Sequence, residues 1–202
     1  MRLNYVVALT VFAYFTSNIY SAPVPKVTKA MGCEYQPYQK GTVWVYEFSK
    51  GVRETRKVTA NEIRGENTQI TIEVSPARHG DKYVLNLEAN ESGVFLLAHD
   101  NAKYDPADKL FPMSFKANTE WKRLPQKVDN AKVNHKCIDI EEVNVPFGTF
   151  KAIRIDTLTT EANIGMEERT WYASGIGIIK HESRLQSGLW NTMELKTFKL
   201  GK

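Results

Sequence analysis

The sequence predicts an all-β protein: a curved antiparallel sheet or open barrel, with at most one or two short helical turns. Two observations lead to this prediction. Apolar residues recur at every second position in several segments, which is typical of strands with one buried face. Clusters of Gly, Asn and Ser separate these segments, and no stretch of ten residues shows the 3.6-residue period of an amphipathic helix. We therefore expect strands joined by tight turns.

The N-terminal segment predicts export. Residues 1–22 place Arg2 ahead of a short apolar run that ends in small residues, the pattern of a secretory signal peptide. Pro23 and Pro25 follow and would end a helix there, so residues 23–36 are expected to form an extended leader. The protein is expected in the periplasm, in the cell envelope or outside the cell. No later apolar stretch approaches the roughly 20 residues of a transmembrane helix.

Residues 37–202 are predicted to form a single β-rich domain, a usual size for one core. The chain has 27 basic and 23 acidic residues, and the two signs are interleaved. A basic tail or patch of five or six like charges is absent from the sequence, which argues against a nucleic-acid partner.

The strands are predicted in chain order from the period of two. In Thr68–Val74, for example, Ile70, Ile72 and Val74 share one face. The other predicted strands are Thr42–Phe48, Lys82–Glu88, Gly93–Ala98, Phe150–Thr157, Glu168–Tyr172, Ile176–His181 and Leu189–Lys199. One helical turn is predicted at Pro106–Leu110, with Asp105 as its cap.

One sequence pattern occurs twice. Pro37–Trp44 and Pro112–Trp121 both contain Pro, then Lys, then a turn, then Thr-x-Trp at the start of a strand. The pattern predicts two similar halves, 37–111 and 112–202, in one curved sheet. A chance match is the alternative, because the pattern depends on four identities and a two-residue gap.

Two cysteines, Cys33 and Cys137, remain after the predicted signal peptide. An even number of cysteines in an exported chain favours a disulfide between them. Two unpaired thiols are the alternative.

Two segments near the C-terminus resemble a signature of exported bacterial proteins of unknown function. Val143–Ile155 is similar to V-x-V-P-A-G-T-F-x-A-x-x-V, and Thr170–Lys180 is similar to W-Y-A-P-G-V-G-x-V-K. Phe147 and Ser174 depart from the usual Ala and Pro, at positions that affect turn geometry. The resemblance implies a curved antiparallel sheet related to the open barrels of lipoprotein-carrier proteins, and it supplies no catalytic residues.

Two clusters of polar residues are candidate metal sites. His135, Cys137, Asp139 and Glu141 alternate along a predicted strand, but same-face neighbours lie about 6.6 Å apart, too far for one ion. Because Ile138 and Ile140 alternate with them, this row is expected to face solvent. The acidic loop from His99 to Lys109 lacks the glycine and ligand order of a calcium loop. The prediction is therefore no metal and no cofactor.

Aromatic residues form the remaining candidate site. Such residues could line a groove for an apolar ligand, although core packing explains them equally well. The predicted set is Trp44, Tyr46, Trp121, Trp171 and Tyr172. The expected function is non-enzymatic binding of an apolar molecule or an envelope component. The alternatives are a metal-dependent or acid/base hydrolase, and a structural or assembly module of the cell envelope.

Overall fold

The computed structural model describes residues 35–75, 80–123, 131–161, 164–185 and 188–202. The predicted signal peptide, most of the leader and Cys33 lie outside these residues. No helix occurs among the described residues, and twelve strands form one antiparallel sheet. The strands are β1 (Val43–Phe48), β2 (Arg53–Arg64), β3 (Asn67–Ser75), β4 (Tyr83–Asn90), β5 (Gly93–His99), β6 (Ala102–Phe111), β7 (Glu120–Arg123), β8 (Lys132–Val145), β9 (Gly148–Glu161), β10 (Ile164–Ala173), β11 (Gly177–Leu185) and β12 (Asn191–Lys199).

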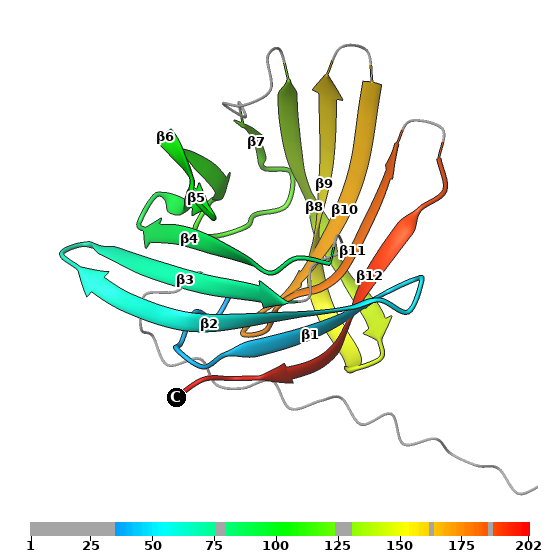
Figure 1. Cartoon of the computed structure of the whole chain (residues 1–202). Helices are drawn as coiled ribbons and strands as arrows, with labels where there is room; N and C mark the ends of the chain where they lie inside the picture. The colour runs from blue at the N-terminus through cyan, green and yellow to red at the C-terminus, as the bar shows by residue number, and fades with distance from the viewer. Residues whose placement is uncertain (1–34, 76–79, 124–130, 162–163, 186–187) are drawn as a thin grey trace, which may run out of the picture.

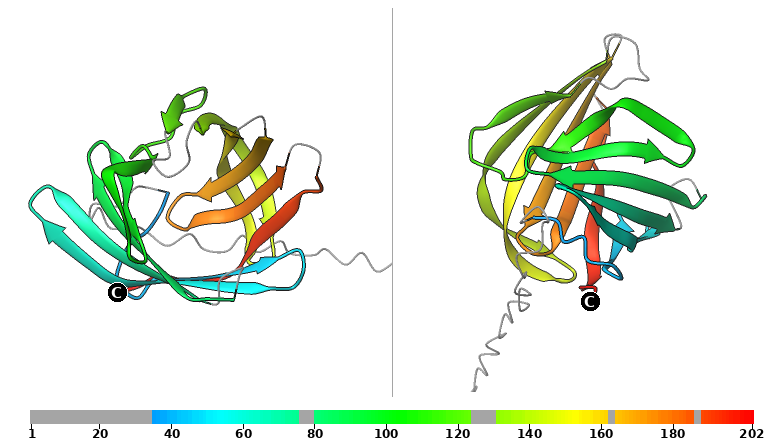
Figure 2. Two further views of the ribbon diagram at one scale, coloured as in Figure 1. Left: turned by 45° about the horizontal axis from the view of Figure 1, so that its top comes forward. Right: turned by 90° about the vertical axis from the view of Figure 1, so that its left-hand side faces the viewer.

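The strand order makes the sheet a nearly closed barrel. It runs β6-β5-β4-β3-β2-β1-β12-β11-β10-β9-β8-β7. Every pair of adjacent strands is consecutive in sequence except β1 and β12, and the consecutive strands β6 and β7 form the two edges. The sheet curls until its two edge strands, β6 and β7, come near each other (Figures 1 and 2). The all-β prediction is confirmed, and the inner face of the curled sheet carries the core.

The predicted alternation is present in the strands. In β3 every second residue is buried, including Ile70, Ile72 and Val74. In β1, Trp44 and Tyr46 are fully buried. Burying one side of each strand is what holds a sheet of this length in one register, since a one-residue slip would turn the apolar set toward solvent.

Two predictions about local structure are wrong. Pro106–Leu110 lies within strand β6 and forms no helical turn, because Lys109 and Phe111 pair with β5. This long-range pairing overrides the local capping signal of Asp105. The His135 row does not face solvent: His135 and Cys137 are buried on the inner side of β8. A β-bulge between Cys137 and Ile140 then breaks the alternation, and both Asp139 and Ile140 are exposed.

The two copies of the repeated pattern adopt the same turn. In Gln39–Thr42 and in Lys116–Thr119, the amide of the last residue donates to the carbonyl of the first at 3.0 Å. The third residue has positive φ in both, 85° at Gly41 and 64° at Asn118. Glycine and asparagine are the residues that adopt this conformation most readily.

Each turn also contacts the second strand of its half in the same way. The backbones of Val58 in β2 and Cys137 in β8 each exchange two hydrogen bonds with their turn, at 2.8–2.9 Å. Trp44 and Trp121 therefore occupy equivalent positions, at the starts of β1 and β7. Each half is a six-stranded meander, β1–β6 and β7–β12. Descent of the halves from one duplicated unit stays a prediction.

Candidate functional site

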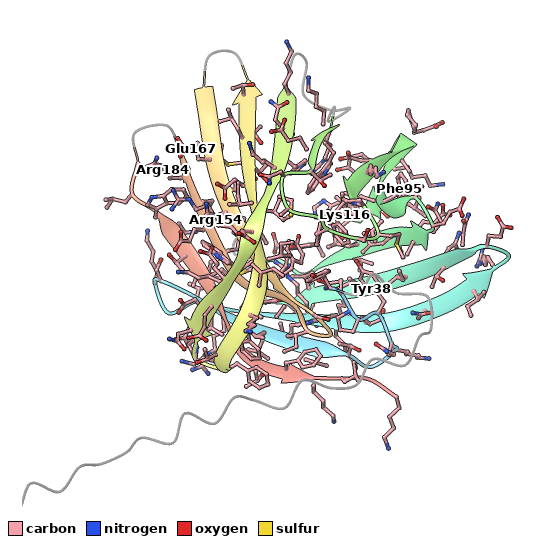
Figure 3. All side chains as sticks on the ribbon, turned by 180° about the vertical axis from the view of Figure 1, so that it is seen from behind. Tyr38, Phe95, Lys116, Arg154, Glu167 and Arg184 are labelled. Atoms are coloured by element: carbon pink, nitrogen blue, oxygen red, sulfur yellow. The ribbon has the colours of Figure 1, made fainter. Side chains whose placement is uncertain are left out.

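A cavity of about 220 Å³ lies inside the curled sheet. Strands of both halves contribute its walls, and most of the wall is aliphatic or aromatic. The aliphatic side chains are Ile72, Leu85, Leu87, Leu110, Ile155 and Ile178. Tyr38 of the segment before β1, labelled in Figure 3, is buried and lines the cavity as well.

Aromatic rings gather on the side of the cavity nearest β7. Phe115, in the connection between β6 and β7, is central to this group. Its ring centroid lies 5.1 Å from that of Tyr172, 5.2 Å from Tyr35, 5.8 Å from Phe111 and 6.1 Å from Trp121. Tilted and offset contacts of this kind are the favourable geometries for aromatic pairs. The rings therefore form a rigid wall on this side of the cavity.

A row of polar side chains crosses this wall because of the strand register. Trp121 in β7 pairs with His135 in β8, His135 with Thr157 in β9, and Thr157 with Glu168 in β10. All four line the cavity. Directly paired residues point to the same face of a sheet. The register, and no local motif, brings these four side chains together.

Two nitrogen atoms of this row are buried without a partner. Among the described residues, neither Trp121 Nε1 nor His135 Nε2 has a hydrogen-bond partner. The two rings stack, with centroids 4.9 Å apart and planes at 17°. The other imidazole nitrogen, His135 Nδ1, lies 2.9 Å from Thr157 Oγ1. A buried polar group without a partner costs about 1–3 kcal/mol, so two adjacent ones are a notable feature of this wall.

Burial changes the proton affinities along the row. It lowers the pKa of His135 from 6.5 to about 4, and the Arg123 guanidinium lowers it further in the same direction. Burial raises the pKa of Glu168, and Arg123 acts against that rise. The imidazole is therefore neutral at pH 7. Arg123 is near enough to influence both groups.

Arg123 also joins the two edges of the sheet. Its Nε donates to both carboxylate oxygens of Asp108 in β6, at 2.6 and 2.8 Å. The Asp108 side chain is only 2% exposed, and that of Arg123 is 27% exposed. The Arg123 terminal nitrogens have no hydrogen-bond partner among the described residues. This ion pair is a polar contact across the gap between β6 and β7.

A second ion pair lies on the other side of the cavity, in β2. Arg56 Nε donates to Glu54 at 2.7 Å, and the guanidinium lies 5.0 Å from the centre of the Tyr46 ring. The Tyr46 hydroxyl donates to the carbonyl of Ile178 at 3.0 Å, and burial raises the pKa of Tyr46. Trp44 Nε1 likewise donates to the carbonyl of Ile176 at 2.6 Å. The polar atoms on this side are therefore satisfied within the protein.

The structure brings together three of the five predicted aromatic residues. Trp44, Trp121 and Tyr172 line the cavity. Tyr46 lies beside it, beneath Arg56. Trp171 does not line it: its indole nitrogen donates to Glu141, and the ammonium of Lys180 lies 5.0 Å from its ring centre.

Sequence reasoning missed several polar residues of the site. Arg123 and Glu168 were not singled out, and His135 was assigned to the wrong face. One signal was available: the repeated Thr-x-Trp places Trp121, like Trp44, at the start of a strand. The partners across from it depend on register and could not be read from the chain.

The residues weighed for metal binding do not converge. Among the described residues, no group of three or more His, Cys, Asp or Glu side chains could hold a metal ion. In the acidic loop, Asp108 is paired with Arg123, and Asp100 accepts a hydrogen bond from the amide of Val84. Within the described part of the chain Cys137 is a buried free thiol. Since Cys33 lies outside that part, the disulfide stays a prediction.

Fold and site together define a class of protein: a twelve-stranded, nearly closed antiparallel barrel with an interior cavity. The chain belongs to the DUF3108-like family, whose model matches residues 55–190. A search of curated proteins gives no significant match. No helix in the described ranges is long and apolar enough to cross a membrane.

Two crystal structures share the fold. One is a protein from Parabacteroides distasonis, provisionally classed as a lipoprotein, with a TM-score of 0.55 and 15% identity. The match covers 83% of this chain and 99% of that one. The other is a protein from Bacteroides fragilis, provisionally classed as exported and described as having a YmcC-like fold. It has a TM-score of 0.55 and 12% identity, and the match covers 83% of this chain and all of that one.

Proposed function

We propose that this chain is an exported binding protein that holds a small apolar molecule inside its curled sheet. The observation that carries the proposal is the interior cavity of about 220 Å³ with its mainly apolar wall. An apolar cavity of roughly 150 Å³ in another protein stays dry and binds benzene. A cavity of the size seen here has room for a small aromatic molecule or part of an alkyl chain.

The position of the cavity favours a small molecule over a protein partner. The cavity lies between the halves of the sheet, and its lining comes from the inner faces of the strands. A second envelope protein would bind an outer surface or a sheet edge, where the large apolar residues exposed in the described part of the chain, such as Ile63 and Leu185, are scattered. Binding of another envelope protein is therefore less well supported than binding of a small apolar molecule.

Export is supported by two independent features. Residues 1–22 have the three parts of a signal peptide. The two proteins of the same fold are classed as exported and as a lipoprotein. We infer that the bound molecule belongs to the cell envelope or to the exterior.

The binding test uses N-phenyl-1-naphthylamine, an uncharged apolar fluorophore that becomes bright in an apolar environment. We expect saturable binding of one molecule per chain by fluorescence titration. Two variants, Leu110→Trp and Leu87→Phe, place bulk in the cavity and should each weaken binding at least tenfold. Two are used because overpacking can disturb folding.

The matched control is Leu158→Trp, a similar change at a side chain that is 44% exposed. It should leave the titration unchanged. Folded cavity variants that bind the fluorophore as well as the natural sequence would overturn the proposal, as would the absence of any saturable signal.

A further inference from the structure

Hydrogen-bond donors without partners occur at one place on the cavity wall. Trp121 Nε1 is buried and has no partner among the described residues, and an indole nitrogen can only donate. The terminal nitrogens of Arg123, two residues further along β7, are also donors without a described partner. Residues i and i+2 of a strand point to the same face, about 6.6 Å apart. These donors therefore face the same part of the cavity.

His135 completes this group. It is only 9% exposed, and its Nε2 has no partner within the described ranges. The stack of its ring on Trp121 holds the two nitrogen-bearing rings side by side. If Thr157 donates to Nδ1, then Nε2 carries the proton and becomes a third donor.

Two carboxylates near this part of the cavity, Asp108 and Glu168, both interact with Arg123. Asp108 is bound to the Nε side of Arg123, which leaves the other side of the guanidinium for a second group. Glu168 lies three strands away from Trp121 along the row, about 14 Å at the usual strand spacing. Burial raises the pKa of Glu168, and Arg123 acts against that rise.

We propose that the bound molecule is an amphiphile with a carboxylate, and that Trp121, Arg123 and His135 bind this carboxylate while the apolar cavity holds the rest. This inference rests on the proposed function and specifies its ligand. A carboxylate offers several acceptor sites in one plane, which suits an arginine and a neighbouring donor better than a hydroxyl or an amine does. A protonated amine would place a cation beside Arg123.

The test compares three molecules that differ only in the head group: decanoate, 1-decanol and decylamine. Each is titrated against the protein loaded with N-phenyl-1-naphthylamine at pH 8, and displacement of the fluorophore is measured. We expect decanoate to displace it at least tenfold more effectively than the alcohol or the amine. Equal displacement by decanol would overturn the carboxylate inference.

The variant Trp121→Phe removes the indole N–H and keeps an aromatic ring against Phe115 and His135. It should lower the affinity for decanoate about tenfold, which is the effect of losing one hydrogen bond to a charged group. Binding of decanol, which lacks the carboxylate, should weaken much less, so the preference for decanoate over decanol should fall. Trp44→Phe is the matched control, because it makes the same change in the same cavity at an N–H that already donates to Ile176. The preference for decanoate over decanol should stay as in the natural protein, whatever the change in the cavity wall does to both molecules alike.

Arg123→Lys provides a second variant. It keeps a positive charge beside Asp108 but loses the planar guanidinium and its array of N–H donors. We expect the preference for decanoate over decanol to fall at least fivefold. If the fluorophore binds but neither Trp121→Phe nor Arg123→Lys alters the head-group preference, the carboxylate site is wrong and apolar binding stands. If the fluorophore does not bind at all, the proposed function itself fails.

Discussion

Trp44 and Trp121 occupy equivalent positions in the two halves of the sheet, yet their surroundings differ. Both follow a turn with the same hydrogen bonds, and both line the same cavity. Trp44 is fully buried and donates to the carbonyl of Ile176. Trp121 is partly exposed, and its nitrogen has no partner among the residues that the structure describes.

The residues paired with these tryptophans differ in the same way. Across from Trp44 lies Arg56, which is bonded to Glu54. Across from Trp121 lies His135, whose Nε2 has no partner in the described part of the chain. In the first half, the polar groups beside the tryptophan are paired within the protein. In the second half, two ring nitrogens have no partner among the described residues, and this is where our proposal places the ligand. The same turn and strand start therefore occur in two different environments, one in the middle of the sheet at β1 and one at its edge at β7.

The largest difference between the halves should appear in stability. Trp44→Ala removes a fully buried ring and leaves the carbonyl of Ile176 without its donor. We expect the free energy of unfolding to fall by about 3–5 kcal/mol. Chemical denaturation followed by far-UV circular dichroism measures it. Trp121→Ala should cost clearly less because that ring is partly exposed; an equal or larger loss would contradict the comparison.

The neutral imidazole on the β8 side predicts a dependence of stability on pH. The pKa of His135 is lowered to about 4, so the unfolded chain takes up a proton between pH 6.5 and 4 that the folded protein resists. Stability therefore falls as the pH falls through this window, by at most about 3 kcal/mol for a shift of this size. Glu168 acts with the opposite sign, because its raised pKa favours proton uptake by the folded state.

The variant His135→Gln separates the two contributions. Its free energy of unfolding should vary less than that of the natural protein between pH 7 and 4. Denaturation curves at half-unit intervals of pH measure the difference. Parallel curves for the two proteins would show that His135 is not held neutral by the fold.

The comparison of the two halves also applies to their ion pairs, Arg123–Asp108 at the edges of the sheet and Arg56–Glu54 in its interior. Asp108→Ala removes the pair between β6 and β7 and should cost about 1–3 kcal/mol of stability, since the half-buried guanidinium of Arg123 loses its partner. Amide hydrogen exchange in β6 and β7 should accelerate more than in β1 and β12. Glu54→Ala, in the interior of the sheet, should lower stability without this selective effect. Uniform acceleration in the Asp108 variant would mean that the edges do not open separately.

The fold could be predicted from the sequence because its signal is local. Ile70, Ile72 and Val74 repeat every second residue, and the turns at Gly41 and Asn118 are marked by residues that favour positive φ. A period of two and a turn are properties of neighbouring residues, so each can be read without knowing the rest of the chain.

The site could be predicted only in part because it depends on register. His135 was placed outside since polar residues are usually exposed, and the bulge after Cys137 left no mark in the sequence. Arg123 and Glu168 lie on strands that meet only in the assembled sheet. The helical turn at Pro106 failed for a related reason, because pairing with β5 decided the conformation.

The smallest predicted effect is also the sharpest test of the comparison. Trp121→Phe removes a buried donor that has no partner among the described residues, so no hydrogen bond to these residues is lost with the nitrogen. The free energy of unfolding should stay within about 0.5 kcal/mol of the natural protein, since removing an unsatisfied polar group is close to neutral. Trp44→Phe makes the same chemical change but leaves the Ile176 carbonyl unpaired, and it should cost about 1–3 kcal/mol. Because the two variants share the same substitution and the same cavity, their difference isolates the role of the hydrogen bond. Equal costs would mean that Trp121 Nε1 is satisfied in solution as Trp44 Nε1 is, and the division of the halves into structure and binding would then be wrong.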